Sequence, residues 1–397
     1  MTGPLNGIRV VDLTRLVAGD YCTSLLASFG ADVLKIEDPL RGDYIGEFGG
    51  EAEGVPVAHH LFNRGKRSIC IDLKRSQGQA LLRRLVDEAD VLVESFRPGV
   101  MRRLGIDHED ARSYHPALVW VSITGYGSAD PRSRAPGHDL NYLAESGLLD
   151  RLTGHDGRPV PPPIPIADLV GGGLLPAFTA MAMLWQVRSS GRGGHVDASI
   201  TDGVALLPSV LLADLTARLP VAAQGYQTFL GGGLACYDVY RLKDGYAAVG
   251  ALEANFWEAL CRILGRPELI ALHSDLPAQP KVRAALAASF GELCTADIGA
   301  LGLEEHACVS VVRRYEDLVS ASEAMTRGTV VAAAAGFAAP GLPFRIDGAV
   351  VSPPSSAPLR GEHTLEVLAE LEVDERDVAA LLATGVVQCT RSGERLR

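Results

Sequence analysis

The sequence lacks several signals that would assign whole classes of function. It has no run of about 20 apolar residues, the length that a membrane-spanning helix requires, and the apolar window Leu174–Trp185 favours a buried helix instead. No apolar stretch near the N-terminus has the length or the flanking residues of a signal peptide. A formal net charge of −11 over 397 residues argues against nucleic acid or an anionic membrane surface as a partner. We therefore expect a cytoplasmic globular protein.

The motifs of metal, dinucleotide and nucleotide triphosphate binding are also missing. The seven cysteines are scattered, form no Cys-x-x-Cys pair and lie at no zinc-like spacing from histidines. The loop after the first predicted strand, Leu16–Asp20, holds a single glycine instead of the dinucleotide pattern, and no Walker motif is present. We expect reduced thiols, no metal ion, no NAD and no ATP.

The first half of the chain alternates β-branched runs with segments of helical spacing. This alternation predicts a doubly wound α/β domain with a parallel sheet, in which ligands bind at the carboxyl ends of the strands. The loops after Leu13, Glu37, Ser95 and Thr124 are therefore the expected ligand-binding loops. The predicted strands cover residues 7–13, 31–37, 68–73, 90–95, 118–124 and 195–200.

The second half changes character after Leu219. Residues 237–241 and 246–251 predict a strand pair around the turn Lys243–Gly245. Helical segments at 256–264, 282–293 and 295–303 follow, which indicates a smaller α+β domain. Residues 364–371 and 376–384 predict two closing helices.

Two side chains that could transfer protons lie in or beside segments that contain proline and glycine, which mark turns and the starts of helices. Asp168 follows a proline-rich stretch and begins a long apolar helix that we expect to reach Arg188, with Pro176 as a possible kink. Its carboxylate could cap that helix, and the unpaired N–H groups there could also stabilise an oxyanion. His138 lies in a Pro-Gly-His-Asp turn, where it is either a turn residue or an acid/base group facing Asp168. Asp139 could cap the helix that follows His138.

A carboxylate and a group of cations complete the set of candidates. Glu253 ends a strand, where it could begin a helix or orient the His138 ring through a hydrogen bond. Six basic residues lie at or beside predicted strand ends, where they form either a solvated surface or a site for a multiply phosphorylated ligand. They are Arg64, Lys66, Arg67, Arg97, Arg102 and Arg103.

Several motifs together resemble the class III CoA-transferase family, also called the CaiB/BaiF family. The resemblance covers nearly the whole chain and is closest to the acyl-CoA racemases of that family. The matching segments are residues 5–13, 29–37, 63–68, 72–74, 94–100, 137–142, 168–173, 249–253 and 359–364.

The resemblance implies a fold and an assembly. It implies a large Rossmann-like α/β domain from both chain ends, residues 1–220 and 330–397, and a small α+β domain, residues 221–329. It also implies an interlocked homodimer in which the large domain of one chain holds CoA. Glu253 then comes from the small domain of the other chain.

The resemblance further implies roles for individual residues. In the family's transferases the aspartate at the Asp168 position attacks a CoA thioester, whereas in its racemases it is a base paired with a histidine at the His138 position. The expected catalytic residues are His138, Asp168 and Glu253. Lys35 and Arg41 are further candidates for the CoA phosphates. The residues expected to bind CoA are Arg64, Lys66, Arg67, Arg97, Asp139 and Tyr142.

The expected reaction is interconversion of (R)- and (S)-2-methylacyl-CoA through an enolate, with no cofactor beyond the CoA of the substrate. The alternatives are a CoA-transferase with Asp168 as nucleophile and a CoA-binding protein without catalytic activity. One departure from the racemase pattern is Ile164, which stands where an asparagine is expected.

Overall fold

The computed structural model describes residues 3–47, 49–52, 55–154, 156–216, 229–332, 338–342, 344–351 and 356–390. The chain forms two compact units, each with its own core. The larger comprises Met1–Ser146, Pro163–Leu207 and Ala321–Arg397, and the smaller comprises Gly147–Pro162 and Pro208–Ser320. The predicted division at 220/221 lies outside the described residues, but residues 147–162 and 208–216, which were predicted for the large domain, belong to the smaller unit. The later division falls at 320/321, against the predicted 329/330, and Arg345 of the larger unit donates a hydrogen bond to the carbonyl of Thr326 at 3.1 Å.

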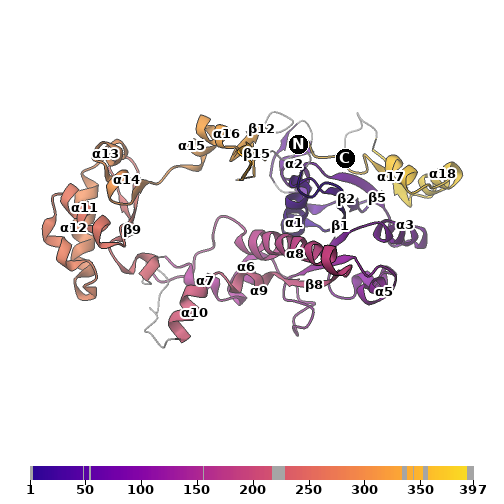
Figure 1. Cartoon of the computed structure of the whole chain (residues 1–397), viewed down its shortest axis with the longest axis horizontal. Coiled ribbons are helices and arrows are strands. Elements are labelled where there is room, and N and C mark those ends of the chain that lie inside the picture. The colour runs from indigo at the N-terminus through magenta and orange to yellow at the C-terminus, as the bar shows by residue number, and fades with distance from the viewer. Residues whose placement is uncertain are drawn as a thin grey trace. The chain divides into compact units, whose positions relative to one another are not determined.

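A seven-stranded sheet in the order β16-β5-β2-β1-β6-β7-β8 forms the centre of the larger unit (Figure 1). Six strands are parallel and only the short β16 runs antiparallel, beside β5. The strand order reverses between β1 and β6, as in doubly wound folds. The strands are β1 (Arg9–Leu13), β2 (Asp32–Glu37), β5 (Arg67–Ile71), β6 (Val91–Glu94), β7 (Val119–Thr124), β8 (Gly194–Ser199) and β16 (Val387–Gln388). The six predicted strands are confirmed, and β16 was not predicted.

Helices cover the sheet because apolar side chains on both of its faces must be buried. One core contains Val11, Leu92 and Trp120 with the inner faces of α3, α17 and α18. The helices of the larger unit are α1 (Leu16–Ser28), α2 (Val57–Asn63), α3 (Ser76–Asp87), α4 (Val100–Arg103), α5 (His108–Tyr114), α6 (Asp139–Glu145), α9 (Ile200–Ala205), α16 (Ser322–Arg327), α17 (Thr364–Glu370) and α18 (Glu375–Ala383), with the 3₁₀ turn η1 (Tyr44–Glu47). Short strand pairs are β3 (Glu51–Ala52) with β4 (Val55–Pro56), β12 (Val330–Ala332) with β13 (Ala338–Pro340), and β14 (Arg345–Ile346) with β15 (Ala349–Val350).

The long apolar helix that begins near Asp168 is present, with an unexpected start. Its first two turns, η2 (Ala167–Leu174), have π-helical hydrogen bonding, and they continue into α8 (Leu175–Ser190) at Pro176. By length and composition alone this helix could cross a membrane. It connects β7 to β8, which are neighbours in the sheet, and η2 and α8 contact these strands or α1. We therefore interpret it as a crossover helix of the α/β fold.

The chain exposes apolar side chains on two helices. Residues 200–216 form two helices, α9 and α10 (Ser209–Thr216), with Pro208 between them. On α10, Leu212 is 65% exposed, and on α8, Phe178 and Trp185 are 63% and 70% exposed. Leaving such large apolar side chains in water is unfavourable, so each of these helices, by itself, offers an apolar face for association.

The smaller unit is an antiparallel sheet packed against helices. Its strands follow the order β11-β10-β9, and the predicted pair is confirmed as β9 (Tyr237–Arg241) and β10 (Tyr246–Gly250), with β11 (Val309–Val311) beside it. Trp257 and Phe290 are fully buried in its core. Its helical segments are α7 (Leu148–Arg151), α10, η4 (Phe229–Gly233), α11 (Ala254–Ile263), η5 (Pro267–Leu272), η6 (Leu276–Ala278), α12 (Gln279–Gly291), α13 (Thr295–Ala300), α14 (Leu303–His306) and α15 (Tyr315–Ser320).

Candidate active site

A cavity of about 350 Å³ lies where the strand order reverses between β1 and β6. It contains His138 and Asp168 together, and all of its walls belong to the larger unit. The loops after β1, β6 and β7 contribute to it, as expected for a doubly wound sheet, whereas the loop after Glu37, which was also expected to bind the ligand, is not among its lining residues. The lining residues are Arg15, Leu16, Ala18, Ser95, Phe96, Arg97, Pro98, Ile123, Thr124, Gly125, Ser133, Ala135, Pro136, Gly137, His138, Tyr142, Asp168 and Ile200.

Asp168 is the second residue of η2 and does not cap it, contrary to one of the expected roles. The cap comes from Asp139, whose carboxylate accepts a hydrogen bond from the N–H of Asp168 at 3.0 Å and another from Ala167. Because Asp139 supplies the cap, the Asp168 carboxylate is left to line the cavity. The same bond ties the residue beside His138 to the residue that carries the second acid/base group.

The environment of Asp168 suits a group that gains and loses protons near neutrality. Burial, and then the nearby charge of Asp139, raise the pKa of Asp168 to about 7. A carboxyl group with such a pKa is present in both protonation states at physiological pH. It can therefore act as an acid or as a base in one reaction.

His138 stands at the start of α6 with an extended backbone and an exposed side chain. Its N–H donates a hydrogen bond to Oδ1 of Asn141 at 3.1 Å, and its carbonyl accepts one from the N–H of Asn141. The buried Tyr142 supports the turn, because its hydroxyl donates to the carbonyl of Gly137 at 2.7 Å. A Cβ atom on Gly137 would lie 2.6 Å from the Tyr142 ring, so this position requires glycine.

The structure places Lys66 in the protein interior and not at a phosphate site. Its ammonium group is fully buried and donates to Oδ2 of Asp12 at 3.0 Å, to the carbonyl of Asp20 and to Oγ1 of Thr23. All three of its donors are therefore occupied. The predicted contact between Lys66 and CoA phosphates is wrong for this reason.

Lys35 belongs to the same buried cluster and is equally unavailable to a ligand. It bonds to Asp20, to Asp43 at 2.7 Å and to the carbonyl of Thr14. Burial raises the pKa of Asp20 well above its ordinary value, and the charge of Asp43 adds to this.

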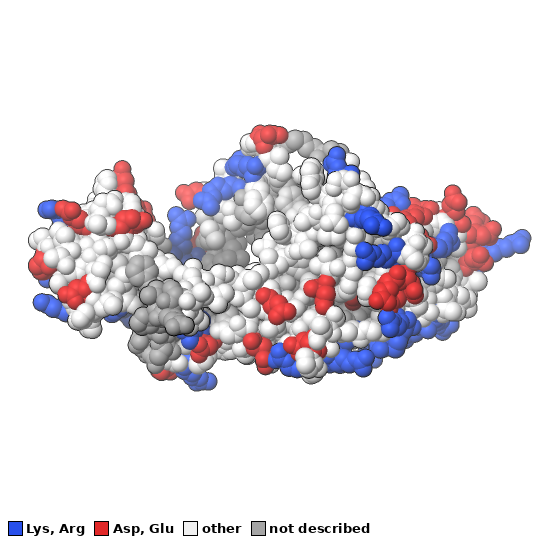
Figure 2. All heavy atoms as spheres, turned by 60° about the horizontal axis from the view of Figure 1, so that its bottom comes forward, with Lys and Arg blue, Asp and Glu red and all other residues white. Residues whose placement is uncertain are grey.

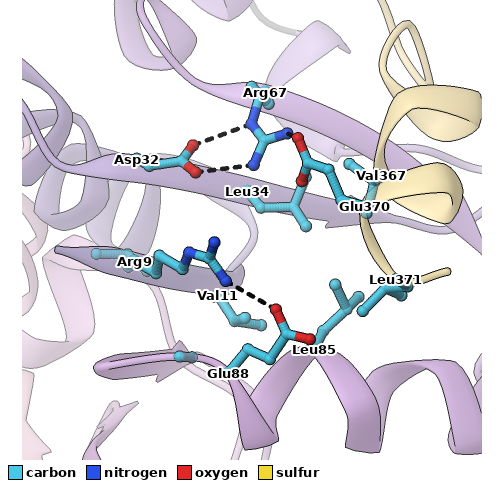
Figure 3. A pocket seen from close by; sticks show the side chains of 12 residues that line it. Arg9, Val11, Asp32, Leu34, Arg67, Leu85, Glu88, Val367, Glu370 and Leu371 are labelled. Atoms are coloured by element: carbon cyan, nitrogen blue, oxygen red, sulfur yellow. Dashed lines mark hydrogen bonds and ion pairs between the residues drawn. The ribbon is translucent and has the colours of Figure 1, made fainter. Parts of the chain in front are cut away.

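Arg67 lies at the amino end of β5, whereas the cavity lies at the carboxyl ends of the strands, and Figure 3 shows its guanidinium between Asp32 and Glu370. It is the first residue of β5, and its guanidinium binds Asp32, Glu366 and Glu370 at 2.8–3.0 Å. Beside it, Arg9 pairs with Glu88. These ion pairs join β5 to β2 and to α17, so Arg67 holds the fold together and is not positioned to bind CoA.

The remaining predicted cations differ in their positions. Arg64 is buried, its pKa is lowered by burial, and its Nη2 donates to the carbonyl of Pro340 at 2.7 Å, so it too is an interior residue. Arg102 pairs with Asp107 at 2.6 Å. Of the six basic residues singled out in the sequence, Arg97 is the one that lines the cavity.

Arg15 lines the cavity but was not singled out in the sequence. It follows Leu13 by two residues, in a loop that was expected to face the ligand, and this position was the signal that could have identified it. Arg41 is exposed on the loop after β2 and donates to the Tyr44 hydroxyl.

Glu253 belongs to the smaller unit. It is exposed and precedes the first residue of α11, with its carbonyl accepting a hydrogen bond from the N–H of Trp257. Its predicted pairing with His138 stays a prediction.

The profile of CoA-transferase family III matches residues 5–364. This chain belongs to that family. It is 32% identical to α-methylacyl-CoA racemase from Homo sapiens, over 98% of both chains. It is also 30% identical to succinyl-CoA:glutarate CoA-transferase from Mus musculus, over 97% of this chain and 90% of that one. A crystal structure of a CaiB/BaiF family protein from Brucella suis superposes with a TM-score of 0.81 and 28% identity, covering 94% of this chain and all of the other.

As a member of CoA-transferase family III, the chain has relatives of two enzymatic classes. Both the racemase and the transferase match over nearly its whole length and at similar identity. The choice between the two reactions therefore depends on the residues in the cavity.

On the face shown in Figure 2, acidic and basic side chains are interspersed and separated by stretches of uncharged atoms. Neither acidic nor basic side chains dominate this face, so the negative net charge is not concentrated on it.

Proposed function

We propose that this family III protein is an acyl-CoA racemase that interconverts (R)- and (S)-2-methylacyl-CoA. The observation that supports the proposal most directly is that His138 and Asp168 line one cavity, with the pKa of Asp168 at about 7. Racemisation at a carbon needs an acid and a base that can exchange roles. The pair meets this need when one of the two groups is protonated and the other is not.

In the proposed mechanism, His138 removes the α-proton from one face of the thioester. The electron pair moves to the thioester oxygen to form an enolate, and protonated Asp168 delivers a proton to the other face. For the opposite enantiomer, ionised Asp168 is the base and the His138 imidazolium is the acid. The chemistry needs no redox or metal cofactor, and CoA enters as part of the substrate.

The start of the Asp168 helix is less available to the enolate than the sequence suggested. The N–H groups of Ala167 and Asp168 already donate to Asp139, and that of Leu169 donates to the carbonyl of Pro165 at 3.0 Å. The enolate oxygen is therefore held by other donors in the cavity, with the dipole of the helix as a further favourable term.

We propose that Arg97 binds the CoA diphosphate, because it is exposed, lines the cavity and follows β6 at the point where the strand order reverses. Asp139 and Tyr142 act mainly by holding the catalytic segments, as their hydrogen bonds indicate.

A homodimer completes the proposal. The exposed apolar residues of α8 and α10 would be covered by a second copy of the chain, and the interlocked arrangement implied by the family resemblance would bring a Glu253 from that copy to His138. We propose the cytoplasm as the location of this dimer.

The second candidate reaction is CoA transfer, which the similarity to the succinyl-CoA:glutarate enzyme favours. Here the ionised Asp168 would attack the thioester carbonyl and expel CoA thiolate, leaving a mixed anhydride for an acceptor carboxylate. This reaction needs a second carboxylic acid, whereas racemisation does not.

The two reactions are separated by incubating the protein with (S)-2-methylacyl-CoA in D₂O without an added carboxylate. We expect deuterium at the α-carbon and loss of optical purity, followed by NMR and chiral analysis. Transfer of CoA to an added carboxylate, with Asp168 trapped by hydroxylamine and no α-exchange, would contradict the racemase proposal and support the transferase.

Asp139→Asn should shift the pH dependence of this exchange. The substitution keeps an oxygen that can accept the N–H of Asp168 but removes the charge that raises the pKa of Asp168. We therefore expect the change in kcat/KM near pH 7, which reflects the ionisation of Asp168, to move to lower pH. Asp139→Ala should move it in the same direction and also lower kcat, because the cap is lost. An unchanged profile in both variants would contradict the coupling between Asp139 and Asp168.

A further inference from the structure

The loop that carries Arg15 is held in place by several independent bonds. The N–H and the hydroxyl of Thr14 donate to Oδ1 of Asp12 at 2.8 and 2.6 Å. The N–H of Arg15 donates to Oγ of Ser95 at 3.0 Å, and the N–H of Leu16 donates to Oδ1 of Asp43 at 3.0 Å.

The same loop contains a strained residue. Leu16 has a φ of 64°, a left-handed conformation that is costly for a residue other than glycine. Such strain persists where the surrounding contacts over-determine it, and it is concentrated in ligand-binding segments. The buried cluster beneath the loop thus holds Arg15 at the cavity.

The Arg15 side chain lies over two aromatic rings, and its charge also helps to lower the pKa of the Asp38 carboxyl. Its guanidinium carbon lies 5.5 Å from the centre of the Phe96 ring and 6.0 Å from that of Tyr44. Within the described residues, no carboxylate forms an ion pair with it, whereas Arg67, Arg102 and Arg132 all have such partners. Arg15 is half-buried and lines the cavity that contains His138 and Asp168.

A cation in this position places a requirement on the acyl group. A hydrocarbon chain covering Arg15 would remove water from the guanidinium without replacing its hydrogen bonds, which is unfavourable. A carboxylate would replace them with two charge-assisted bonds in the fork geometry that arginine provides. The CoA phosphates have a separate candidate in the exposed Arg97.

We propose that Arg15 binds a carboxylate at the far end of the acyl group, so that the substrate is the CoA thioester of a short 2-methyl-branched dicarboxylic acid. This inference rests on the proposed racemase function and specifies its substrate class. It makes Arg15 a specificity-determining residue, which recognises the substrate without taking part in the proton transfer.

The test compares two thioesters of equal chain length, 2-methylglutaryl-CoA with its terminal carboxylate and 2-methylpentanoyl-CoA with a methyl group in that place. We expect the wild-type protein to prefer the diacid thioester by about 10- to 100-fold in affinity and in kcat/KM for α-exchange, the range for a hydrogen bond to a charged group. Arg15→Met should remove this preference by weakening only the diacid thioester. Arg15→Lys should restore part of it.

Arg97→Gln is the matched control, because the loss of a phosphate contact should raise the KM of both thioesters equally. An equal loss for both thioesters in Arg15→Met would show that Arg15 binds the CoA phosphates and would overturn the proposal. No effect of Arg15→Met, or no wild-type preference, would overturn it too. Affinity is measured calorimetrically as well as by turnover, so the role of Arg15 is tested even if neither thioester exchanges its α-proton, the result that would refute the racemase function.

Discussion

Asp168→Asn is expected to lower the rate of α-proton exchange by at least about 10²- to 10⁴-fold, the usual contribution of a positioned acid or base. The amide can neither accept nor deliver a proton at neutral pH, so exchange should be lost from both enantiomers. CoA transfer would be lost as well, because the amide is a poor nucleophile.

His138→Ala separates the two candidate reactions. If the protein is a racemase, this variant should lose exchange to a similar extent as Asp168→Asn. If it is a transferase, Asp168 still provides the nucleophile and CoA transfer should persist. Exchange that continues in His138→Ala would contradict the proposed acid/base pair.

Asp168→Asn also has an expected effect on stability, and this effect serves as its folding control. Because the pKa of Asp168 is raised to about 7 in the folded protein, the folded state holds a proton that the unfolded state releases above its ordinary pKa of 3.8. The native group therefore lowers stability increasingly from about pH 4 to pH 7, and by a constant amount above that. Asp168→Asn should unfold at a higher temperature than the wild type at pH 8 and at a similar temperature near pH 4. A lower Tm at both pH values would show that the loss of activity arises from misfolding.

Lys66→Met is expected to destabilise the protein by about 3–5 kcal/mol, the cost of removing one partner from a buried ion pair. Lys66 is fully buried, and its loss would leave Asp12 and the carbonyl of Asp20 without their cationic donor. Although burial alone would raise the pKa of Asp12, Lys66 and Lys35 hold it below its ordinary value. Urea-induced unfolding at pH 7 measures the difference.

Lys74→Met is the matched control for this change. The Lys74 side chain is 75% exposed and lies 3.6 Å from Asp38, so its loss should cost less than about 1 kcal/mol. If Lys66 bound a CoA phosphate instead, Lys66→Met would raise the KM for acyl-CoA and leave the unfolding midpoint close to that of the wild type. Equal midpoints for Lys66→Met and Lys74→Met would thus contradict the buried cluster.

The sequence by itself determined the framework of the larger unit. Six β-branched runs became the parallel strands of its sheet, because fully buried strands require apolar side chains on both faces and this composition is visible locally. The same logic located the end of the sheet where the cavity lies, since the loops after Leu13, Ser95 and Thr124 all reach that cavity. His138 and Asp168 were identified from local turn and helix signals and from the family resemblance, and both line that cavity.

Only the tertiary structure decided what the charged residues do. Lys66 and Arg67 are adjacent in the sequence, yet Lys66 is buried with Asp12 beneath the β1 loop and Arg67 binds Asp32 at the amino end of β2. Asp12 lies 54 residues from Lys66 and Asp32 lies 35 residues from Arg67, and the other carboxylate partners of Arg67 lie 299 and 303 residues away, so local sequence could not assign these partners. The roles of Asp139 and Arg15 were hidden for a related reason. Asp139 caps a helix that begins 28 residues later, and Arg15 lines the cavity in a loop held by Asp43, which lies 27 residues from Leu16. Burying an unpaired charge is unfavourable, so the role of a buried charged side chain depends on the partner that it contacts. The packing of the whole fold determines that partner.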